Sequence, residues 1–200
     1  MGRVERKQRQ KTEVRSAIHQ AAWQMVKKEG WQALSIRKIA DAIEYSIPVI
    51  YDHFENKEAI LFEFAKEGFL LLSKKVEAAR KKYTDPEEAL EAMAKAYWSF
   101  AVNNEEYYQL MYGLGMPSCE VDGQNVGCVC YDQLMLETVR EIIAAGSNPD
   151  MDYKLKFYTL WSFLHGLIAM NRMKNSPASK NMNQVILKDA INSFIRGLKG

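Results

Sequence analysis

Hydrophobic residues recur with helical spacing along almost the whole chain, and the alternation typical of strands is nearly absent. Near the start, Val14, Ile18, Ala22 and Val26 recur every fourth residue, which predicts an amphipathic helix over about 8–29. The same spacing predicts helices beginning after Ser35, Ser46 and Asn104, and others over about 57–82, 86–103, 128–145, 152–174 and 182–198. We therefore expect an all-α protein of about nine helices with no sheet.

Turn residues mark several boundaries between these helices. Gly30 follows the first helix and tolerates the left-handed conformation common at helix ends. Asp85 and Pro86 precede Glu87 and Glu88, which together give a capping carboxylate, a proline at N1 and an acidic first turn. Residues 113–127 contain four Gly and one Pro, so we expect the main irregular loop there.

The segment from Ser35 to Phe54 has the spacing of a helix-turn-helix motif. A helix of about nine residues, a three-residue turn and a second short helix follow one another. In this motif the second helix lies in the major groove of DNA. We expect Ile50 and Phe54, four residues apart, to point into a small core. The alternative is a buried helical hairpin with a solvated charged face.

The side chains around the second helix of the motif suit contacts with DNA. An apolar tip formed by Ile47, Pro48 and Val49 would contact thymine methyl groups. Lys57 opens the following helix, where its ammonium group and the free backbone N–H groups favour a phosphate. The predicted DNA-binding residues are Ser35, Arg37, Lys38, Ser46, Ile47, Pro48, Val49, Tyr51, His53 and Lys57.

The distribution of charge supports an anionic partner for the N-terminal part alone. Residues 1–57 contain 11 Lys and Arg against 7 Asp and Glu, whereas residues 58–200 contain 16 against 18. A basic segment joined to a slightly acidic remainder is typical of a nucleic-acid-binding region followed by a part with another role.

Several positions also match one family pattern without a gap, within LSIRKIADAIEYSIPVIYDHFENKEAILFEF: Ile39-Ala40, Ser46, Ile50-Tyr51, His53-Phe54, Asn56-Lys57 and Ile60. In these residues the chain resembles the TetR family of bacterial transcriptional repressors, from about Arg9 to Phe69. Further on, Trp161, His165 and Gly166 are similar to the Trp–x–x–x–His–Gly signature of one TetR subgroup. Glu44 departs from the pattern, which usually has Gly; in a left-handed turn this costs up to about 1 kcal/mol.

The resemblance implies a nine- or ten-helix fold with an N-terminal helix-turn-helix domain over 1–56. It implies a C-terminal helical domain for ligand binding and dimerisation over 57–200. The expected protein is a ligand-responsive regulator, a repressor that binds a palindromic double-stranded DNA operator as a homodimer and is released by a small-molecule inducer. The helix over about 57–82 would carry the change between the two sites. No enzymatic activity is expected.

The last two predicted helices are apolar on more than one face. In the first of them, Phe157, Leu160 and Leu164 share one face while Phe163 and Met170 share another. Helices of this kind need cover on several sides, so we expect the homodimer to form through these two helices. The alternative is that they only complete the core of one chain.

Aromatic and methionine side chains concentrate in the middle helices and suit a mainly apolar ligand. His165 would be the polar group there, either as a ligand contact or bonded to a backbone carbonyl. The same spacing also fits an ordinary core. The predicted ligand-binding residues are Tyr97, Trp98, Tyr108, Met111, Tyr112, Tyr131, Met135, Trp161 and His165.

Three cysteines, Cys119, Cys128 and Cys130, raise the alternative of a DNA-binding thiol or soft-metal sensor, although passive thiols in a Gly-rich loop explain them as well. The chain shows no secretory segment and no membrane span, which predicts a reduced, cytoplasmic protein. We expect no cofactor and no resident metal. A helical small-molecule carrier or enzyme is a further alternative, but no HExxH, Ser/His/Asp set or phosphate loop supports it.

Overall fold

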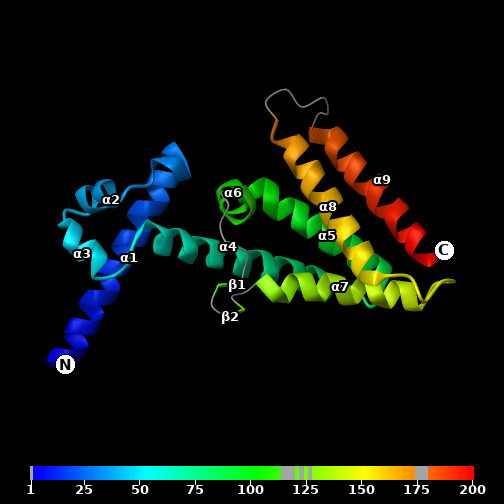
Figure 1. The fold of residues 1–200 in the computed structure, drawn as a ribbon, viewed down its shortest axis with the longest axis horizontal. Helices are drawn as coiled ribbons and strands as arrows, with labels where there is room; N and C mark the ends of the chain where they lie inside the picture. The colour runs from blue at the N-terminus through cyan, green and yellow to red at the C-terminus, as the bar shows by residue number, and fades with distance from the viewer. Residues whose placement is uncertain (1, 114–119, 122–123, 126–127, 174–179) are drawn as a thin grey trace. The chain divides into compact units, whose positions relative to one another are not determined.

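The computed structural model describes residues 2–113, 120–121, 124–125, 128–173 and 180–200, and Figure 1 shows their arrangement within each part of the chain. These residues form α1 (Arg3–Glu29), α2 (Ile36–Ala42), α3 (Ile47–Tyr51), α4 (Lys57–Arg80), α5 (Pro86–Asn103), α6 (Glu105–Gly113), α7 (Cys128–Ala144), α8 (Tyr153–Asn171) and α9 (Lys180–Lys199). A short 3₁₀ helix, η1 (Trp31–Ala33), follows α1. The prediction of an all-α fold with nine or ten helices is confirmed.

The described residues depart from the prediction in three places. First, α1 begins at Arg3 instead of near residue 8, because its first turns consist of Arg, Glu, Lys and Gln, which favour helix without any hydrophobic period. Second, α8 ends at Asn171 instead of near residue 174. Third, β1 (Glu120–Val121) and β2 (Gln124–Asn125) pair antiparallel inside the predicted loop, so the expectation of no sheet was wrong for this small hairpin.

The chain forms two compact units. The first unit comprises residues 1–67 and 106–116, and the second comprises 68–105 and 117–200. Helix α4 contributes its first half to one unit and its second half to the other. The functional division near residue 56 remains a prediction, since it concerns what each part does.

The core of the first unit is built on α1. Val14, Ile18, Ala22 and Val26 are buried, as their spacing predicts, and they share the core with buried residues of α2, α3 and α4. An aromatic contact also stabilises this unit. The ring of Trp23 stacks on that of Tyr107, with their centroids 4.5 Å apart. These contacts hold α6 against α1 within the same unit.

The second unit is a helical bundle in which α5 packs against α7, α8 and α9. Figure 1 shows α8 and α9 side by side and running in opposite directions. One face of α9 is buried through Leu187, Ile191, Ile195 and Leu198, which matches the predicted hydrophobic spacing.

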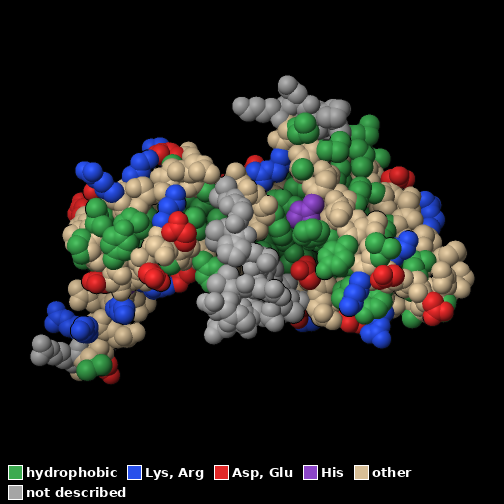
Figure 2. Space-filling model, viewed as in Figure 1, with side chains coloured by type: hydrophobic (Ala, Val, Ile, Leu, Met, Phe, Trp, Pro, Cys, Tyr) green, Lys and Arg blue, Asp and Glu red, His purple; other side chains and the backbone are tan. Residues whose placement is uncertain are grey.

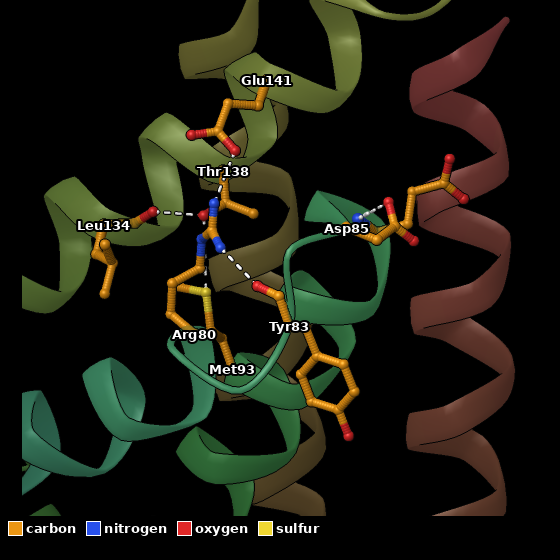
Figure 3. Close-up of polar contacts among 8 residues, drawn as sticks. Arg80, Tyr83, Asp85, Met93, Leu134, Thr138 and Glu141 are labelled. Atoms are coloured by element: carbon orange, nitrogen blue, oxygen red, sulfur yellow. Dashed lines mark hydrogen bonds and ion pairs between the residues drawn. The ribbon is translucent and has the colours of Figure 1, made fainter.

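Polar contacts fix the turn between α4 and α5 on α7, as Figure 3 shows. The guanidinium of Arg80 donates to the carbonyl oxygen of Tyr83 (3.1 Å) and pairs with the Glu141 carboxylate (2.9 Å). The carboxylate of Asp85 accepts from the backbone N–H of Glu87 (3.3 Å) and so caps α5 as predicted. The Asp85 cap therefore sets the start of α5, and the ion pair between Arg80 and Glu141 holds the end of α4 on α7.

Candidate nucleic-acid interface and ligand site

Helices α2 and α3 form a helix-turn-helix whose turn contains an unusual backbone conformation. Glu44 has φ of 59°, the left-handed value that the motif needs and that glycine adopts more easily. The backbone N–H of Tyr45 donates to the carbonyl of Ala40 (3.0 Å) and closes the turn. Ser35 and Ser46 occupy the N-cap positions of α2 and α3, but neither side chain makes a capping hydrogen bond.

Helix α3 exposes one face and buries the other. Ile50 and Phe54 are buried at 0% and 3% exposure, as predicted from their spacing. In contrast, Ile47 is 40% and Tyr51 52% exposed, and Ser46 and Pro48 are exposed with them, while Val49 is half-buried. Figure 2 shows hydrophobic side chains gathered on the surface over α2 and α3. This exposure argues against a buried helical hairpin.

The other predicted DNA contacts lie at the ends of neighbouring helices. Arg37 and Lys38 are exposed at the start of α2, and the Lys38 ammonium pairs with the Glu29 carboxylate at 3.1 Å. Lys57 is the first residue of α4, as expected. The Asn56 side-chain oxygen accepts from the backbone N–H of Ala59 (2.7 Å). The backbone N–H groups that precede Ala59 in the first turn of α4 have no partner within the helix and can bind another acceptor.

Arg15 of α1 is a positioning residue that the sequence analysis missed. Its guanidinium donates to the carbonyl oxygen of His53 (2.7 Å), just after α3. It also pairs with the Glu63 carboxylate of α4 and lies 4.2 Å from the centre of the Phe54 ring. One side chain thus joins α1 to the end of α3 and to α4, and no spacing rule predicts a contact across 38 residues.

His53 lies half-buried beside this contact. Burial, followed by the positive charges of Lys11 and Arg15, lowers the pKa of His53, while Asp52 raises it. Its Nδ1 is enclosed and accepts no hydrogen bond in the described structure. We therefore assign the proton of the neutral ring to Nε2, because a buried unpaired N–H is less favourable than an unpaired lone pair.

Six of the predicted ligand-binding residues belong to the second unit. The Tyr97 hydroxyl and the His165 Nε2 are 2.7 Å apart, joining α5 to α8. The ring of Trp161 lies 4.1 Å from that of His165, and the ring of Tyr131 lies 5.9 Å from that of Tyr97. Burial lowers the pKa of His165 to about 4, so its ring is neutral near pH 7. Trp98 and Met135 are buried in the same unit.

The remaining three predicted ligand residues, Tyr108, Met111 and Tyr112, lie on α6 in the first unit. The rings of Tyr108 and Tyr112 are in contact with centroids 4.9 Å apart. The nine residues are thus divided between the two compact units, with the polar pair Tyr97 and His165 in the second.

Asp132 of α7 is a half-buried carboxyl group that the sequence analysis also missed. Burial raises the pKa of Asp132 to about 6, and a hydrogen bond from Tyr131 offsets part of this shift. Its Oδ1 is enclosed and makes no hydrogen bond in the described structure. A carboxyl oxygen enclosed without a hydrogen bond is costly, and carboxyl groups with raised pKa values are common at functional sites. The sequence holds no signal for this burial, since the helical spacing of α7 does not mark Asp132 as a core position.

Among the described residues, no group of three or more His, Cys, Asp or Glu side chains is placed to hold a metal ion. Cys119 and the side chains of Cys128 and Cys130 lie outside the described residues, so the sensor alternative stays untested. No described helix is long and apolar enough to cross a membrane.

Family models match both parts of the chain. Residues 18–64 match the model of bacterial regulatory proteins of the tetR family. Residues 90–185 match the tetracyclin repressor-like C-terminal domain. No curated protein sequence matches the chain significantly.

Solved structures share the fold over nearly the whole chain. A protein of unknown function from Rhodococcus sp. RHA1 is 25% identical, with a TM-score of 0.76 over 93% of this chain and 95% of that one. The TetR family transcriptional regulator PfmR from Thermus thermophilus is 22% identical, with a TM-score of 0.66 over 92% and 99%. The fatty acid degradation regulator FadR from Bacillus halodurans is 20% identical, with a TM-score of 0.65 over 93% and 94%.

Proposed function

We propose a function for this chain from one premise: it belongs to the TetR family of bacterial regulatory proteins and is a transcriptional regulator of that family. On this premise it acts as a repressor that binds a palindromic operator as a homodimer. A small, mainly apolar molecule bound in the C-terminal part releases it from DNA. It carries out no catalysis.

The exposed tip of α3 is the observation that carries this proposal. Ile47, Pro48 and Tyr51 are presented to solvent on a helix anchored by the buried Ile50 and Phe54. Apolar groups at the tip suit thymine methyl groups in the major groove, and the Tyr51 hydroxyl suits a phosphate oxygen. Selection of operators from random duplex DNA tests the proposal directly, because a regulator enriches a palindrome whose half-sites are about one helical turn apart.

Replacing Lys57 by Ala is expected to weaken binding to all DNA sequences alike. Loss of one phosphate contact lowers the slope of log affinity against log salt by about 0.9 and the affinity at 0.1 M salt by about eightfold. The measurement is a salt titration with selected and random duplexes.

Val49→Thr provides the contrasting variant, since Val49 would contact bases and not phosphates. We expect it to change the selected sequence while leaving the salt slope as in the wild type. An unchanged slope for Lys57→Ala would remove that residue from the phosphate contacts.

An exposed stripe on α8 and α9 supports dimerisation through these helices. On α8, Leu155 (61% exposed), Tyr158 (60%) and Met170 (40%) lie on the same exposed side as Gly166. On α9, Val185 is 62% exposed. Large apolar side chains at helical spacing on one surface are typical of an interface, and small residues between them allow helices to approach closely.

Gly166→Arg is expected to weaken dimerisation at least about tenfold, because a buried unpaired charge in an interface costs several kcal/mol. A Cβ at Gly166 meets no atom within 4 Å in the single chain, so the substitution leaves the monomer fold intact. Sedimentation velocity over a range of concentrations measures the change. Ala144→Arg, at an exposed position of α7, is the matched control and keeps the wild-type dimer. Equal behaviour of the two variants would place the dimer interface elsewhere.

The side chains around Tyr97 and His165 support a mainly apolar ligand with one or two polar groups. Tyr97, Tyr131 and Trp161 contribute aromatic surface, while the neutral His165, bonded to the Tyr97 hydroxyl, adds polarity without charge. Asp132 adds a carboxyl oxygen that has no hydrogen-bond partner among the described residues, which suits a hydrogen-bond donor on the ligand.

A further inference from the structure

The first turns of α1 form an exposed basic helix beyond the core of the first unit. All residues from Val4 to Glu13 are exposed, and the helix is continuous from Arg3 to Glu29. Lys7 and Lys11 lie one turn apart on the same face of this segment. Figure 2 shows Lys and Arg side chains on the surface near the N-terminal end. Because this segment continues a helix anchored in the core, its lysines are held on a rigid support.

This face of α1 borders an open groove of about 720 Å³ beside α3. Val4, Lys7 and Lys11 line it from α1, and Val49, Asp52 and His53 line it from α3 and the residues that follow. The positive charge of Lys11 lowers the pKa of His53, which places the two side chains close enough to interact. The groove therefore adjoins the helix that would enter DNA.

Both lysines of the groove keep their charge available. No carboxylate in the described part of the chain lies within 4.0 Å of either ammonium group, whereas Arg9 is paired with Glu13 at 2.9 Å. Asp52 contributes one negative charge to the groove, which leaves a net positive charge from the two lysines. This combination fits a phosphate group better than a carboxylate-rich or apolar partner.

We propose that Lys7 and Lys11 hold the phosphate backbone of DNA in the groove between α1 and α3, beside the base contacts of α3. The inference rests on the proposed function and adds residues outside the helix-turn-helix motif to it. Two lysines on a rigid helix fix the position of one strand without reading its sequence.

The test is a salt titration of the full-length Lys7→Gln/Lys11→Gln variant on random duplex DNA. We expect the slope of log affinity against log salt to fall by about 1.8 and the affinity at 0.1 M salt to fall by about 60-fold. Removal of positive charge from the start of a helix is neutral or stabilising for that helix, so circular dichroism should show full helicity.

Lys28→Gln/Lys66→Gln is the matched control, because it removes the same number of positive charges from the same compact unit. Lys28 lies on the same helix as Lys7, about 31 Å further along at 1.5 Å per residue, and both control lysines are exposed in the first unit. This control should change the slope by less than about 0.5. If the slope of log affinity against log salt falls no more for Lys7→Gln/Lys11→Gln than for the control, the proposal is overturned.

The outcomes also separate this inference from the proposed function. If wild-type protein shows no salt-dependent binding to DNA, both fail. If the wild type binds and Lys57→Ala lowers the slope while Lys7→Gln/Lys11→Gln does not, only the groove contact fails. Loss of binding to phosphatidylserine vesicles without any effect on DNA would assign the lysines to a membrane surface and overturn the proposal.

Discussion

Replacing Arg15 by Ala is expected to lower the stability of the first unit by about 2–3 kcal/mol. The substitution removes a charge-assisted hydrogen bond to the His53 carbonyl and a contact with the Phe54 ring. The Glu63 pair adds little, because both side chains are more than one third exposed. DNA affinity should fall at least about tenfold, since the end of α3 loses its link to α1 and 1.4 kcal/mol corresponds to one factor of ten. Urea unfolding followed by tryptophan fluorescence measures the stability.

Arg9→Ala is the control for Arg15→Ala on the same helix. Arg9 pairs with Glu13 one turn later, where both side chains are exposed, and such pairs contribute about 0.3–0.5 kcal/mol. Arg15→Lys should recover only part of the loss, because an ammonium group lacks the planar fork and stacks poorly on Phe54. Equal stabilities for Arg9→Ala and Arg15→Ala would show that Arg15 does not position α3.

Replacing Asp132 by Asn is expected to stabilise the protein at pH 7 by about 3 kcal/mol, the value of a pKa raised from 3.8 to about 6. The folded carboxyl group takes up a proton as the pH falls through 6, whereas the unfolded group does so only near 3.8. The cost of the buried charge therefore disappears below about pH 4, and so does the advantage of Asn. Urea unfolding at pH 7.5 and at pH 4 measures the difference.

His165 makes the stability depend on pH in the opposite direction to Asp132, over the same pH range. The pKa of His165 is lowered to about 4, so the folded state stays neutral while the unfolded state takes up a proton below about 6.5. Its contribution to stability is complete above pH 6.5 and is lost as the pH falls toward 4. In Asp132→Asn only this loss remains, and the stability should fall more steeply with acid than in the wild type.

Glu137→Gln, on the same helix as Asp132 but with its side chain 43% exposed, is the control and should change stability by less than about 0.5 kcal/mol. Parallel stability curves for Asp132→Asn and the wild type between pH 7.5 and 4 would show that Asp132 is not buried as described.

Much of the fold could be predicted because its signals are local. Val14, Ile18, Ala22 and Val26 mark the buried face of α1, and Asp85 with Pro86 marks the start of α5. The left-handed residue at position 44 also followed from the motif.

The features that the sequence did not predict depend on distant contacts or on residues without a hydrophobic period. Arg15 bonds a carbonyl 38 residues away, and the Oδ1 of Asp132 is enclosed by packing that no local pattern describes. The first turns of α1 are helical although their polar residues show no apolar face. The side-chain pair of Tyr97 and His165 likewise joins positions 68 residues apart.

The conformation of Glu44 has a consequence for how long a complex with DNA lasts. Glycine would adopt the same backbone angles at lower free energy, and the carboxylate brings a negative charge into the turn of the motif. A chain selected only for tight binding would keep neither feature. Under the proposed function, a lower affinity would shorten the residence time on an operator, so that occupancy would follow changes in the concentration of a releasing ligand quickly.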